Sequence, residues 1–74
     1  MNTQRITAQS KANIQAADRA ELVASGEEQM VKIWKEGRAA FVCGKEGPML
    51  YPTANDARRA VKRLRPKLEL TSFN

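Results

Sequence analysis

The residues best suited to chemistry with a partner are the basic side chains of residues 54–67. This segment contains six Arg and Lys residues and one acid, Asp56, which together give it a charge of +5. The other seven basic and seven acidic residues of the chain cancel. A charge excess confined to one segment produces a directed field, so the segment predicts a negatively charged partner.

Arginine outnumbers lysine in this segment by four to two. The planar guanidinium group can pair with two oxygens of one phosphate or carboxylate, whereas the lysine ammonium group is a point charge. The partner could therefore be a nucleic acid or an acidic protein surface. The other interpretation is a solvated helix face that keeps a small protein soluble.

The same segment has the pattern of an amphipathic helix. Thr53 is the predicted N-cap, Asp56 places an acid in the first turn, and Pro66 ends the helix at about Arg65. One face is small and apolar and would pack on a sheet. It consists of Ala57, Ala60, Val61 and Leu64. The opposite face carries the predicted binding residues Arg58, Arg59, Lys62, Arg63 and Arg65.

Trp34, the only tryptophan, is the remaining candidate binding residue. If residues 30–35 form a strand, Met30, Lys32 and Trp34 share one face, and Val31 and Ile33 share the other. Trp34 would then lie on the outer face, where it could anchor a partner. The alternative is that Trp34 belongs to the core.

The sequence offers little for catalysis. There is no histidine, so Cys43 lacks the usual activating base, and we expect it to be a buried structural thiol. Gly44 and Gly47 flank Lys45, but their spacing fits neither a P-loop nor a dinucleotide-binding turn. The glutamates have no predicted apolar pocket that would raise a pKa. We therefore expect a protein that is not an enzyme and that has no catalytic residue, metal site or cofactor.

The elements that position the basic helix are short. At 74 residues the chain has room for one small domain. Residues 30–35 and 38–43 are apolar and separated by Glu36-Gly37, which predicts a hairpin. A capping-box pattern at Ser25-Gly26-Glu27-Glu28 supports the competing interpretation of residues 27–36 as a helix. Residues 49–51 are a predicted third strand, stopped by Pro52.

The two ends have weaker patterns. Residues 1–11 are mostly polar and predict a mobile arm. Residues 12–24 are rich in helix formers but lack an apolar face, which predicts a nascent or frayed helix ended by Ser25-Gly26. The tail alternates polar and apolar residues from Lys67 to Thr71. It could be an edge strand or a loose peptide that becomes ordered on a partner.

The predicted fold class is therefore α+β, a three-stranded antiparallel meander packed on one C-terminal helix (βββα). Residues 1–26 would be a flexible arm or frayed helix, residues 27–66 the core domain, and residues 67–74 a tail or edge strand. No run of apolar residues is long enough to span a membrane, and the N-terminus lacks the apolar region of a signal peptide. We expect a cytoplasmic protein, with no membrane partner and no small-molecule substrate.

The C-terminal half resembles a layout common in small bacterial and phage proteins. Residues 32–43 correspond to its hairpin, residues 49–51 to its third strand, and residues 52–57 (Pro-Thr-Ala-Asn-Asp-Ala) to its helix start. In size, basic helix and polar tails, the chain is also similar to small phage-encoded regulators that bind host RNA polymerase. This resemblance implies a class of function and a place in the host cytoplasm, and it assigns no individual residue.

The sequence thus leads to one expected function and two alternatives. We expect a non-enzymatic regulator of transcription that docks on nucleic-acid machinery, first of all RNA polymerase, and occludes or displaces another factor. The first alternative is direct DNA or RNA binding through the basic helix, with a slope of log K against log salt of about −4.5 if five cations meet phosphates. The second alternative is a structural or assembly subunit.

Overall fold

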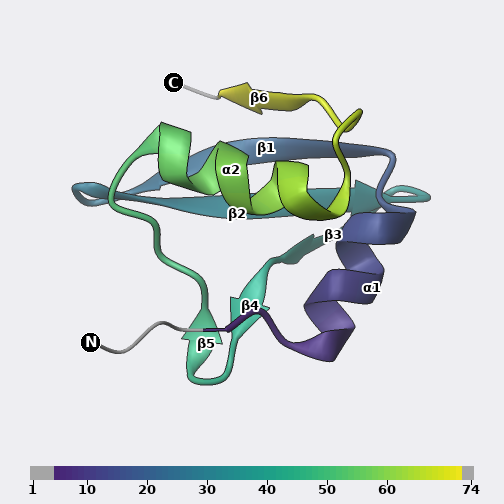
Figure 1. Cartoon of the computed structure of the whole chain (residues 1–74), viewed down its shortest axis with the longest axis horizontal. Helices are drawn as coiled ribbons and strands as arrows, with labels where there is room; N and C mark the ends of the chain where they lie inside the picture. Colours follow the sequence, from purple (N-terminus) through teal and green to yellow (C-terminus); the bar gives the residue numbers. More distant parts are fainter. Residues whose placement is uncertain (1–4, 73–74) are drawn as a thin grey trace.

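Two helices and a mixed four-stranded sheet make up the core of the protein (Figure 1). A computed structural model describes residues 5–72. The sheet has the strand order β3-β2-β1-β6, and a two-stranded ribbon, β4-β5, lies beside it. The elements in chain order are α1 (Ala8–Ala16), β1 (Arg19–Ser25), β2 (Glu28–Lys35), β3 (Arg38–Phe41), β4 (Cys43–Gly44), β5 (Gly47–Pro48), α2 (Ala54–Leu64) and β6 (Leu70–Ser72). The expected α+β fold class is confirmed, whereas the expected βββα order of elements is not observed.

The predicted hairpin is present as β2 and β3, so the helical interpretation of residues 27–36 is wrong. Lys35 pairs with Arg38 across the two-residue turn Glu36-Gly37. Both turn residues have positive φ, 51° and 80°, as a type I′ turn requires. The side chain of Asp18 accepts a hydrogen bond from the Glu36 N–H at 2.9 Å and holds the turn against the start of β1. β3 ends at Phe41, two residues earlier than expected.

The predicted helix over residues 12–24 is present only for residues 12–16, which belong to α1. The helix begins earlier, because Thr7 caps it by accepting from the Ser10 N–H at 3.2 Å, and it ends at Ala16. Residues 19–25 are instead β1, which pairs along its whole length with β2. Ala20 and Leu22 face the core at alternate positions, and this burial outweighs the helix propensity of the alanines.

The predicted N-terminal arm therefore needs correction for residues 5–26. Ile6 forms a bridge with Gly44, and the Thr7 N–H donates to the carbonyl oxygen of Cys43 at 3.0 Å. The supposed helix cap at Ser25-Gly26-Glu27-Glu28 is the β1–β2 turn, with Gly26 at φ 62°. The part of the predicted arm formed by residues 1–4, and the part of the predicted tail formed by residues 73–74, lie outside the described residues.

The third strand of the predicted meander is absent from the main sheet. Tyr51 alone of residues 49–51 pairs with it, through two hydrogen bonds of 2.8 Å to the backbone of Gln29. Pro48 and Pro52 flank this stretch and have no N–H to extend a ladder. The tail instead supplies β6, which runs parallel to β1 at the edge of the sheet, so the edge-strand interpretation is confirmed.

The predicted helix is α2. Thr53 is its N-cap and accepts from the Asp56 N–H at 3.2 Å, and the helix ends at Leu64. Ala57 and Val61 are fully buried against the inner face of the sheet. α1 contributes Ile14 to the same core, so both helices lie on this face and the opposite face carries no helix.

Candidate anion-binding surface

The structure divides the five predicted cations of α2 and its C-cap among four directions. Successive residues of a helix differ by about 100° around its axis. Arg58 and Lys62 therefore share the flank that faces β6, and both line a groove there. Arg63 lies on the other flank, while Arg59 projects from the back of the helix and is exposed. Arg65 turns inward, toward α1.

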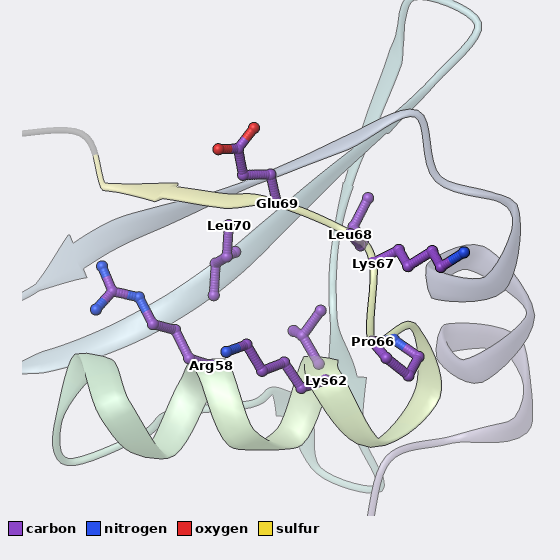
Figure 2. A pocket seen from close by; sticks show the side chains of 8 residues that line it. Arg58, Lys62, Pro66, Lys67, Leu68, Glu69 and Leu70 are labelled. Atoms are coloured by element: carbon purple, nitrogen blue, oxygen red, sulfur yellow. The ribbon is translucent and has the colours of Figure 1, made fainter.

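The groove between α2 and β6 is the most extended part of this surface (Figure 2). It has a volume of about 610 Å³. In Figure 2, Arg58 extends from α2 on the side of β6 and Lys62 extends along α2 toward Arg58, whereas the carboxylate of Glu69 points away from α2. The full lining consists of Arg58, Val61, Lys62, Pro66, Lys67, Leu68, Glu69 and Leu70. Three cations, Arg58, Lys62 and Lys67, thus border a floor of largely buried apolar side chains.

The charges of this surface are uncompensated. Within residues 5–72 the only ion pair joins Arg19 and Glu21, at 3.6 Å and on another part of the protein. The side chain of Asp56 accepts a hydrogen bond from the Thr53 hydroxyl at 3.0 Å instead of pairing with a cation. Arg58, Arg59, Lys62 and Arg63 therefore have no ion-pair partner within residues 5–72. We call these four residues the cationic surface.

Arg65 has a structural role that the four residues of the cationic surface do not share. Its guanidinium group donates to the carbonyl oxygens of Ile14, Gln15 and Ala17, at 3.3, 2.5 and 3.4 Å. These carbonyls lie at the C-terminal end of α1, which carries the negative end of the helix dipole. The Ile14 carbonyl also accepts from the Ala17 N–H at 3.2 Å, so Arg65 adds a second donor there. Arg65 thus caps α1 and fixes it to α2, and we leave it out of the cationic surface.

Trp34 lies on the open face of the sheet, half-buried and opposite to α2. Its indole N–H donates to the carboxylate of Glu21 at 2.6 Å. The guanidinium carbon of Arg19 and the ammonium nitrogen of Lys32 lie 4.4 and 4.7 Å from the ring centroid. Trp34 thus occupies the outer face, and the interpretation of Trp34 as a core residue, which the shortage of large apolar side chains favours, is wrong. The structure does not bring Trp34 together with the cationic surface.

Cys43 is half-buried, not fully buried as expected, and its Sγ donates to the carbonyl oxygen of Phe41 at 3.3 Å. Next to it, the backbone N–H of Cys43 donates to the buried Ser10 hydroxyl at 2.7 Å. Sequence reasoning missed this link between α1 and the β4 ribbon, because Ser10 carries no signal beyond its place after Thr7. In the described part of the chain, no cluster of three or more His, Cys, Asp or Glu residues could hold a metal ion.

No protein family, curated protein or solved structure matches the chain. Among the residues that the structure describes, no helix has the length and apolar character needed to cross a membrane.

Proposed function

We propose that this protein is a small non-enzymatic regulator of transcription that docks on nucleic-acid machinery through the cationic surface. RNA polymerase is the first candidate partner, and binding would occlude or displace another factor. The observation that carries the proposal is the group of four α2 cations with no carboxylate paired to any of them within residues 5–72. Such a surface attracts negative partners over several ångströms and fixes their orientation.

The mixed character of the surface favours a protein partner over a phosphate backbone. Arg58 and Lys62 border the apolar side chains of Val61, Leu68 and Leu70 in the β6 groove. Protein interfaces combine a core of apolar contacts with charged groups at their rim. A nucleic-acid backbone offers phosphates and sugars but few apolar groups for such a floor. An acidic protein segment with one or two apolar side chains would fill the groove more completely.

The proposal is tested by capturing partners from a cell lysate with and without nuclease. The Arg58→Glu/Lys62→Glu variant should lose RNA polymerase from the captured set, and nuclease treatment of the wild type should leave it bound. A matched control is Lys35→Glu/Arg38→Glu, which reverses the same two charges beside the exposed β2–β3 turn. Loss of polymerase with the control, or its retention by the α2 variant, would contradict the assignment to the cationic surface.

Direct nucleic-acid binding is the second candidate. It is favoured by the exposure of Arg59, Lys62 and Arg63 around the outer side of α2, from one flank to the other. A single helix without a partner helix makes phosphate contacts more readily than base contacts, so binding would have little sequence specificity. The slope of log K against log salt for DNA binding distinguishes this function from docking on a protein.

A further inference from the structure

A second hollow, on the flank of α2 away from β6, has the make-up of a small-molecule site. Its volume is about 520 Å³. Arg63 borders it from α2, Lys11 from α1 and Arg5 from the segment before α1. The complete lining is Arg5, Ile6, Lys11, Met49, Tyr51, Ala60, Arg63 and Leu64.

The lining combines an apolar body with one sign of charge. Ile6, Met49, Ala60 and Leu64 provide the apolar walls. All three charged residues are basic and none of the lining residues is acidic. A few polar groups converging on a mostly apolar hollow are typical of sites that bind small organic molecules. The charge of the ligand must be negative to balance three cations.

The hydroxyl of Tyr51 is a second, independent observation that points to a ligand in this hollow. Only 8% of its surface is exposed, and its hydroxyl is buried without a hydrogen-bond partner in the described part of the chain. Buried hydroxyl groups are nearly always hydrogen-bonded, so this one needs an explanation. Burial raises the pKa of Tyr51 above its usual value, so the hydroxyl keeps its proton and remains a donor. A bound acceptor would satisfy it.

The fold brings these groups together from four separate segments. The Ile6–Gly44 bridge holds the start of the chain beside the β4 ribbon. Tyr51 is fixed by its two backbone hydrogen bonds to Gln29 of β2. α2 then covers the remaining side with Ala60 and Leu64. The convergence of segments from both ends of the chain distinguishes this hollow from a charged face on a single helix.

We infer that this hollow binds a small amphiphilic anion, a molecule with an apolar body and a carboxylate, sulfonate or phosphate group at one end. The apolar body lies against Met49 and Leu64, and the anionic group meets Arg5, Lys11 and Arg63. The Tyr51 hydroxyl, which is buried in the free protein, donates to an acceptor of the ligand once the side chains that cover it move aside. This site is separate from the β6 groove, with which it shares no residue.

A fluorescent aromatic sulfonate, 1-anilinonaphthalene-8-sulfonate, is a suitable probe because it has the stated chemistry. Titration should show one saturable site in the wild type. Arg63→Gln should weaken its binding about tenfold, because it removes a charge-assisted contact. Tyr51→Phe should weaken it about fivefold, the effect of one neutral hydrogen bond, without lowering the unfolding temperature. Arg59→Gln, on the same helix but outside the hollow, should bind as the wild type does.

Competition then tests the class of ligand. Decanoate should displace the probe and decanol, which has the same chain without the charge, should do so at least tenfold less well. Equal competition by the two, several weak probe sites, or equal binding by all three variants would overturn the inference. Arg58→Glu/Lys62→Glu should leave probe binding unchanged. The small-molecule site and the proposed docking function can therefore fail independently.

Discussion

The role of a single side chain is hardest to predict from the sequence when its contacts are to a distant segment of the chain. Arg65 is one of six basic residues in its segment, and the helical period places it at the edge of the cationic face. Its contacts are to the carbonyls of α1, about 50 residues earlier in the chain. Because the position of α1 could not be predicted, the capping role of Arg65 could not be predicted either. The helical period predicts a single cationic face for Arg58, Arg59, Lys62 and Arg63, whereas in the structure they are spread over both flanks and the back of α2.

The role of Arg65 predicts a loss of stability that the other cations do not share. Arg65→Ala removes the donor of the Gln15 and Ala17 carbonyls, while Ile14 keeps the Ala17 N–H, and should lower the free energy of unfolding by about 1–3 kcal/mol. Urea unfolding followed by circular dichroism measures the change. Arg65→Lys should recover part of it, because lysine keeps the charge but not the planar fork. Arg59→Ala should change it by less than about 0.5 kcal/mol, and an equal loss in this control would contradict the capping role.

At the scale of elements, strong local signals predicted the structure and ambiguous ones did not. The cap at Thr53, the apolar face of α2 and the Glu36-Gly37 turn are short-range patterns, and each is present in the structure. β1 was missed because its alanines favour a helix when considered alone. Its conformation is fixed by pairing with β2 on one side and β6 on the other, which a single local window cannot show.

The β2–β3 turn offers a way to stabilise one element. Glu36 has a positive φ of 51°, a conformation that costs energy for a residue with a long side chain. Glu36→Asn creates the Asn-Gly pair that type I′ turns prefer, and should raise the free energy of unfolding by about 0.5–1 kcal/mol. The backbone hydrogen bond from residue 36 to Asp18 is retained. Thermal unfolding compared with Glu36→Ala, which lacks the asparagine preference, tests the effect. An equal gain from alanine would show that the turn conformation is not the cause.

At the scale of the whole molecule, the sheet separates two chemically different faces. The inner face carries both helices, the β6 groove and the second hollow. The outer face carries Trp34 between two cations and hydrogen-bonded to Glu21. The basic helix could be placed on a sheet from its sequence, since its apolar face requires one. The hollows beside it could not, because α1 and β6, which complete them, follow from long-range pairing.

The distribution of charge over the whole molecule also decides between the two candidate functions. With Arg65 committed to α1, four cations remain to meet phosphates. Direct nucleic-acid binding should then give a slope of log K against log salt of about −3.6, rather than the −4.5 expected for five. Fluorescence anisotropy of labelled DNA at increasing salt measures this slope. Arg59→Gln should reduce its magnitude by about 0.9, because one phosphate contact is lost, whereas Arg38→Gln at the β2–β3 turn should leave it unchanged. A steeper slope that decreases in the Arg38→Gln variant would show that the contact surface extends beyond α2. If no DNA binds at low salt, docking on a protein remains the proposed function of the cationic surface.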